Sequence, residues 1–156
     1  MDPCSPKNLQ PFFKRAAARG RIVLPSQDGV CLMKMRCEEM PDALRAGEIR
    51  FQGVDWDGLN VSHIHLPAGA DATGLLEGMP QNLCQCPHWG LVLKGSINVR
   101  YADGKTEKVH AGEAYYWPAG HTVWVDEDYS AIEFSPAEGM REVMDHLRGK
   151  LEAAPA

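Results

Sequence analysis

The feature that most constrains this chain is a succession of short apolar runs, each ended by a turn that contains glycine or proline. Between Leu59 and Phe134 these runs alternate apolar and polar residues with a period of two, which is typical of half-buried β-strands. Asp103-Gly104 separates two of the runs and favours a tight hairpin. We therefore expect about eight to ten short strands arranged as a β-sandwich or β-barrel.

The two ends of the chain follow other patterns. Residues 1–20 are polar and basic and are expected to form an N-terminal arm ahead of a β-domain over residues 21–135. Ser135 to Glu138 make a capping box with proline at the first helical position, and apolar residues follow at helical spacing. An amphipathic helix that ends near Leu151, and then a short tail, are therefore expected over residues 136–156.

The expected strands cover residues 22–24, 31–37, 51–58, 59–66, 89–93, 96–101, 106–110, 113–117, 121–125 and 130–134. Two long segments are expected to lie outside them. The polar segment 38–47 predicts a loop or a short helix, and 69–85, which contains two further glycines and a Met-Pro pair, predicts a long surface loop.

Charge and composition exclude several classes of function. The 16 Lys and Arg against 21 Asp and Glu give a net charge of −5, which argues against a nucleic-acid partner. No apolar run approaches the roughly 18 residues that a membrane span requires. An odd count of five cysteines, with no visible signal peptide, predicts reduced thiols in the cytoplasm.

The densest group of metal-competent side chains is Cys84, Cys86 and His88, at positions i, i+2 and i+4. In an extended chain they share one face but lie too far apart to meet at one ion, unless Pro87 kinks the chain or another ligand joins them. Thiolate with imidazole suits zinc, iron or copper better than magnesium or calcium. The alternative is that both cysteines are small buried residues and the histidine is a hydrogen-bonded core group.

Two stretches resemble the motifs of the cupin superfamily. Leu91–Gly95 is similar to its VLxG strand end, and Gly112–His121 contains a complete G-x5-P-x-G motif. The resemblance covers about residues 59–135. It implies an all-β, cupin-type double-stranded β-helix, which is a jelly-roll-like barrel, followed here by the C-terminal amphipathic helix.

The resemblance also implies a divalent transition metal held inside the barrel, although the first motif departs from the usual pattern. His88 stands where cupins usually have glutamate, and Val123 stands at the position of the later histidine, with His121 two residues earlier on the same strand face. The implied ligands are His88, His121 and one or both of Cys84 and Cys86, because the family's two motif strands face each other across the barrel.

The alternation in residues 89–93 conflicts with that arrangement. Trp89, Leu91 and Leu93 lie on the strand face opposite to His88, so apolarity alone would point His88 outward. The family geometry points it inward, and we follow the family geometry.

Other residues are candidates for a ligand pocket. Tyr101, Tyr115 and Trp117 are suited to the walls of a cavity, since their rings provide apolar area and a phenol can orient a ligand. Glu133, flanked by apolar residues, is either exposed to solvent or an acid that lines the barrel. Val123 completes this predicted pocket.

Two further patterns have ordinary explanations. His63 and His65 share a strand face, but they occur one strand too early for the metal motif and are expected to be a polar face. The stripe Cys31, Met33, Met35 and Cys37 could bind a soft metal or be oxidised, but such faces are usually core.

Three functions remain open from the sequence: a metal-dependent oxygenase, isomerase or lyase of small molecules; a non-catalytic metal or redox sensor; and a metal-free small-ligand barrel or dimeric scaffold. Three protein ligands would leave a coordination position open for catalysis, whereas four would favour a structural or sensing role. The resemblance also implies a homodimer. The identity of the metal and of any substrate is left open.

Overall fold

The computed structural model describes residues 34–153. The predicted arm 1–20, the predicted strand 22–24, and Cys31 and Met33 of the sulfur-rich stripe lie outside the described residues. Of the described residues, 36–153 belong to one compact unit.

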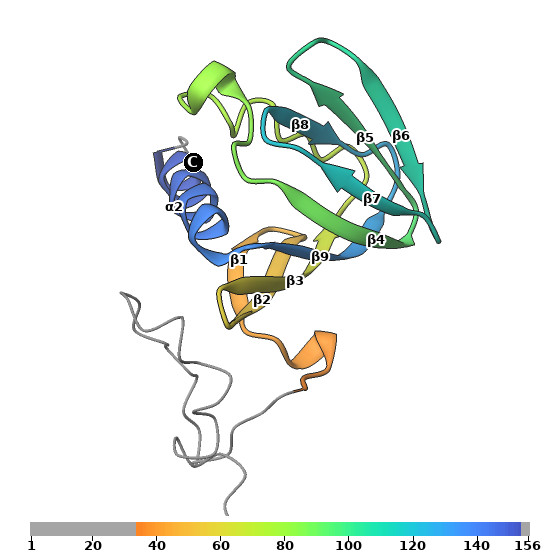
Figure 1. Ribbon diagram of the computed structural model, residues 1–156, viewed down its shortest axis with the longest axis vertical. Helices are drawn as coiled ribbons and strands as arrows, with labels where there is room; N and C mark the ends of the chain where they lie inside the picture. Colours follow the sequence, from red (N-terminus) through yellow and green to blue (C-terminus); the bar gives the residue numbers. More distant parts are fainter. Residues whose placement is uncertain (1–33, 154–156) are drawn as a thin grey trace, which may run out of the picture. The chain divides into compact units, whose positions relative to one another are not determined.

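Within the described residues, the unit contains two antiparallel sheets and a C-terminal helix (Figure 1). The larger sheet has the spatial order β1 (Asp42–Ala46), β2 (Ile49–Trp56), β3 (Leu59–Leu66), β9 (Tyr129–Pro136), β4 (His88–Lys94) and β7 (Ala114–Trp117). The smaller sheet has the order β6 (Thr106–His110), β5 (Ser96–Tyr101) and β8 (His121–Trp124). Helix α2 (Ala137–Ala153) follows β9, and η1 (Cys37–Glu39) and η2 (Pro80–Asn82) are short 3-10 helices. The predicted all-β class with a C-terminal helix is confirmed.

Most strands lie where the alternation places them, and β5 and β6 have the predicted bounds. The prediction of a loop or a short helix over residues 38–47 is wrong for most of the segment, because it contains the whole of β1. This strand pairs with β2 and buries Leu44, so tertiary pairing overrides a polar local sequence. The predicted strand 31–37 is also wrong in its described part, because Lys34–Arg36 have no regular structure and Cys37 begins η1.

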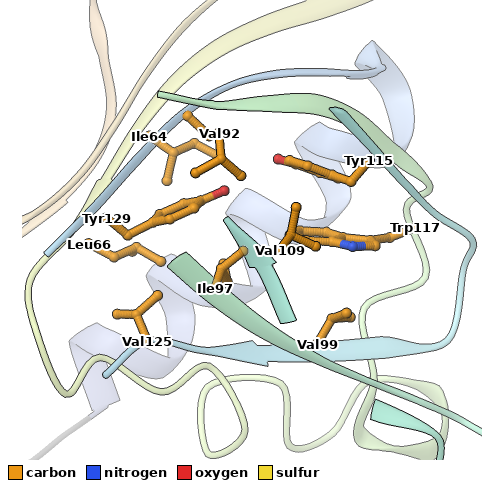
Figure 2. Close-up of a cluster of buried hydrophobic side chains, with 11 residues drawn as sticks. Ile64, Leu66, Val92, Ile97, Val99, Val109, Tyr115, Trp117, Val125 and Tyr129 are labelled. Atoms are coloured by element: carbon orange, nitrogen blue, oxygen red, sulfur yellow. The ribbon is translucent and has the colours of Figure 1, made fainter. Parts of the chain in front are cut away.

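A close-packed apolar core lies between the two sheets (Figure 2). The rings of Tyr115 and Trp117, from β7, stack with their centroids 3.9 Å apart. Val92 from β4 and Ile97 and Val99 from β5 are almost completely inaccessible to solvent. Each such side chain contributes about 1.5–3 kcal/mol through removal of its apolar surface from water.

Strand β4 places its large and small side chains on opposite faces. His88, Gly90 and Val92 point inward and are buried, whereas Trp89, Leu91 and Leu93 are 45%, 41% and 48% exposed. The large residues therefore form an outer apolar surface, which continues onto Tyr116 and Phe134. The predicted homodimer stays a prediction.

The surroundings of Gly90 explain why the inner face of β4 carries a residue without a side chain. A Cβ at this position would overlap the Tyr115 ring, which lies directly over the glycine backbone. The absence of a side chain at Gly90 therefore makes room for Tyr115, and the strand pairing sets Gly90 opposite both Tyr115 and Glu133.

Helix α2 covers a second apolar cluster, which lies against β1 and the segment before β4. Met140, Val143, Met144 and Leu147 are buried on one helical face, as the helical spacing predicts. The prediction of a surface loop over residues 69–85 is partly wrong, because Leu76 is only 3% exposed and packs in this cluster. None of the helices in residues 34–153 is both long and apolar enough to traverse a bilayer.

Replacing Gly90 with alanine is expected to destabilise the fold by about 1–3 kcal/mol, because the added methyl group must displace the Tyr115 ring in a packed core. Urea unfolding followed by tryptophan fluorescence measures the change. Gly74→Ala is the control, since a Cβ there meets no other atom. Equal stability of the two variants would contradict the packing described for Gly90.

Candidate metal centre

Backbone pairing brings the two motif segments together. Cys84 lies just before β4 and forms an isolated antiparallel bridge with His121, the first residue of β8. The Cys84 N–H donates to the His121 carbonyl at 2.8 Å, and the Gly120 N–H donates to the Cys84 carbonyl at 2.7 Å. The chain then bends at Cys86 and enters β4 at His88. This bend brings the side chain of His88 close to that of Cys84.

The resulting group contains Cys84, His88 and His121. One donor atom from each lies within 4.8 Å of the other two, and all three residues are buried. Cys84 Sγ lies 3.4 Å from His88 Nε2, and the imidazole centroids are 5.1 Å apart with their planes at 79°. No other such group of His, Cys, Asp and Glu donors is found among residues 34–153.

Hydrogen bonds at Nδ1 orient the two imidazoles so that their Nε2 atoms face the group of donor atoms. His121 Nδ1 lies 2.7 Å from the Pro118 carbonyl, which can only accept, so Nδ1 carries the proton and Nε2 has a free lone pair. His88 Nδ1 lies 2.8 Å from Ser135 Oγ and 3.3 Å from Glu133 Oε1. Such partners on the second nitrogen are typical of metal-ligating histidines, because they fix the tautomer and the ring orientation.

Burial controls the protonation of this group. It lowers the pKa of His88 to about 4, and burial together with the neighbouring His88 lowers the pKa of His121 to about 4. Both imidazoles are therefore neutral at pH 7, the form in which they bind metals. Burial raises the pKa of the Cys84 thiol to about 12, so a metal ion would have to displace its proton.

The donor set fits a transition metal in chemistry and in spacing. A tetrahedral ion about 2.3 Å from sulfur and about 2.0 Å from nitrogen would hold these two donors about 3.5 Å apart. The observed Sγ–Nε2 separation is 3.4 Å. A thiolate and two neutral imidazoles suit zinc, iron or copper, and the identity of the metal stays open.

Glu133 lies beside the donors. Its Oε2 accepts a hydrogen bond of 2.9 Å from the Tyr115 hydroxyl, and its Oε1 faces His88 Nδ1. Burial raises the pKa of Glu133 to about 7 and raises that of Tyr115 above its usual range. Because His88 is neutral at pH 7, this contact is a hydrogen-bonded network and not an ion pair.

The other predicted site residues divide into two sets. The cavity described below is lined by Trp117, Val123 and Glu133, among others. Tyr101 does not, since its hydroxyl donates to Glu107 at 2.7 Å on the exposed part of β5. Tyr115 reaches the site only through Glu133.

Cys86 stands apart from the donor group. Its Sγ donates to the Pro87 carbonyl at 3.6 Å and lies against Gly139 of α2. Cys86 is separated from the donors because the chain bends at this residue. In a continuous strand its side chain would lie on the same face as those of Cys84 and His88. His63 and His65 alternate along β3 with the buried Ser62, Ile64 and Leu66, so they lie on the opposite face of the sheet from the core.

Sequence reasoning missed Ser135, which was assigned only to the helix cap. It is 1% exposed and shares the inner face of β9 with Glu133, two residues earlier. The period-two spacing from Glu133 was the available signal. The helix residues that line the cavity had no comparable signal, because an amphipathic pattern does not say what the apolar face contacts.

A cavity of about 110 Å³ opens beside the donors. Its polar members include Cys84, His88, His121 and Glu133, together with Asp71 and Thr122. The remaining wall is mostly apolar and comes from β1, β2, β3, the segment 70–76 and α2. The cavity can therefore hold a small molecule in contact with an ion at the donor group.

Comparisons with known proteins support the fold. No protein-family model and no curated protein matches the sequence. An RmlC-like cupin from Shewanella frigidimarina is 16% identical, with a TM-score of 0.52 over 69% of this chain and 93% of its own. Ectoine synthase from P. lautus is 12% identical, with a TM-score of 0.53 over 71% and 86%. Oxalate decarboxylase of B. subtilis is 18% identical, with a TM-score of 0.51 over 70% of this chain and 30% of its own.

The order of the strands, the C-terminal helix and these structural neighbours together define a cupin fold. The chain therefore has the cupin fold that its motifs resemble, with a candidate metal site in which a thiol joins two imidazoles.

The two neighbouring cysteines make a matched test of the donor group. Cys84→Ser is expected to lower zinc affinity by at least about tenfold, since it removes a donor, whereas Cys86→Ser is expected to leave it unchanged. Competition with a chromogenic zinc chelator measures both affinities. Equal losses in the two variants would contradict the assignment of Cys84 alone.

Proposed function

We propose that the protein binds one divalent transition metal ion through Cys84 Sγ, His88 Nε2 and His121 Nε2, and uses it in a reaction on a small molecule. The observation that carries the proposal is the convergence of three buried donor atoms within 4.8 Å at the wall of a cavity. When bound, such an ion supplies Lewis-acid chemistry to a substrate atom. An oxygenase, isomerase or lyase reaction is compatible with this arrangement.

Three protein ligands favour catalysis over a structural role. A closed four-ligand site leaves no position for a substrate, whereas three ligands leave one, and here the cavity adjoins the donor group. The apolar wall would limit the access of water to that position.

The residues around the donors have distinct tasks. Ser135 and Glu133 orient the His88 ring through Nδ1, and the Pro118 carbonyl does the same for His121. Glu133 is the one buried acid among the described residues that line the cavity, so its carboxylate is placed to hold a proton next to the donor group.

A metal or redox sensor is the alternative. The thiol of Cys84 favours it, because a thiolate ligand can be oxidised and its oxidation would alter metal binding. A sensor with a filled coordination sphere needs a fourth protein ligand, and Glu133 is the nearest carboxylate to His88.

Elemental analysis of protein purified without an affinity tag tests the metal site. His88→Ala and His121→Ala are each expected to reduce the metal from about one ion per chain to near zero, because two remaining donors bind weakly. His110→Ala, at an exposed position on β6, is the control and should keep the wild-type content. Full retention of metal in both of the first variants would exclude the proposed ligands.

X-ray absorption spectroscopy of the zinc-loaded protein separates enzyme from sensor. An enzyme site is expected to show one sulfur and two imidazole ligands with an additional oxygen scatterer that a soluble inhibitor such as azide displaces. A Glu133→Gln variant serves as the comparison, because loss of the oxygen scatterer in this variant would identify Glu133 as a fourth ligand and favour the sensor.

A further inference from the structure

We infer that the ligand of the cavity is a small, uncharged molecule with an apolar body and one oxygen or sulfur atom directed at the donor group. This inference rests on the proposed function, whose substrate class it names. It follows from the charge, the size and the composition of the cavity wall.

The wall has no cationic side chain among the described residues. Its charged members are Asp71 and Glu133, both acidic. An anion that enters the cavity would lose its hydration and find neither lysine nor arginine to pair with. The wall therefore disfavours carboxylates and phosphates.

A bound divalent ion would be held by a donor set that includes a sulfur ligand. A thiolate ligand offsets one of the two positive charges of such an ion, whereas a third imidazole would offset none. The donor set therefore leaves less positive charge for an anionic ligand than three imidazoles would.

The apolar part of the wall determines the shape of the ligand. Leu44 and Ile49 contribute from the β1–β2 hairpin, and Met140, Met144 and Leu147 contribute from α2. Apolar cavities of about 150 Å³ are known to bind benzene. The cavity here is smaller, at about 110 Å³, so it sets an upper limit of about one six-membered ring with a small head group, or a short branched chain.

Helix α2 is the part of the fold that closes the apolar end of this cavity. Its two buried methionines are flexible and polarisable, so they can adapt to ligands of somewhat different shape. The polar end is formed by strand residues and by Cys84 before β4. It is held by hydrogen bonds, so it fixes where the ligand's oxygen or sulfur lies.

Phenol and benzoate are the probes, since they share one ring and differ in head-group charge at about pH 7. Titration of the ¹⁵N-labelled full chain with each probe, in zinc-loaded and in metal-free form, gives the affinity and the location. We expect phenol to shift the amides of residues 70–76 and 137–151, and benzoate to bind at least about tenfold more weakly in both forms.

Two variants that fill the cavity test the location. Ala72→Phe places a ring at the cavity wall, and Val123→Phe does so from β8, which provides a second test if the first does not fold. Ala114→Phe is the matched control at an exposed position of β7. Phenol binding should fall by at least about tenfold in the cavity variants and stay unchanged in the control.

The inference is overturned if phenol fails to bind, if benzoate binds as tightly as phenol, or if phenol binds equally to both folded cavity variants. Binding of phenol to metal-free protein that also fails to acquire zinc would support the cavity assignment and refute the metal site. The two proposals can therefore fail separately.

Discussion

Two short backbone hydrogen bonds between the segment before β4 and the start of β8 are the interaction on which the site depends. They join Cys84 to Gly120 and His121, which are distant from it in sequence, and they link the segment that leads into β4 of the larger sheet to the start of β8 in the smaller one. The bend at Cys86 then brings His88 back to within 3.4 Å of the Cys84 sulfur. Without this bridge the three donors would belong to different surfaces, and the apolar core would enclose isolated polar groups at a cost of several kcal/mol.

Hydrogen bonds around the donors explain how the core tolerates these polar groups. Ser135 Oγ and Glu133 Oε1 both contact His88 Nδ1, Tyr115 donates to Glu133, and the Pro118 carbonyl accepts from His121. His121 therefore retains a lone pair on Nε2 that no described side chain uses, and His88 Nε2 has only the weak contact with the Cys84 thiol. A site built only for stability would leave fewer unused donors and acceptors in so dry an environment.

The cupin fold itself does not say what the site does, since its structural neighbours include proteins named as a decarboxylase and a synthase. The features of this chain that bear on its function lie at the cavity: the thiol among the donors, the α2 helix against the cavity, and a wall whose charges are all acidic among the described residues. The acidic wall and the sulfur among the donors are the basis of the neutral ligand proposed above.

The sequence by itself determined the class of fold, the bounds of β5 and β6, the amphipathic helix, and the two segments that carry His88 and His121. These follow from local periodicity and turn chemistry, which act over a few residues. Tertiary structure decided the rest. The alternation in β4 would have turned His88 outward, and only the Tyr115 ring over Gly90 shows why the small residues face the core. The choice of Cys84 over Cys86, the entry of Ser135 into the site and the strand at Asp42–Ala46 all depend on pairing between segments distant in sequence, and no pattern within one segment encodes which distant segment it will meet.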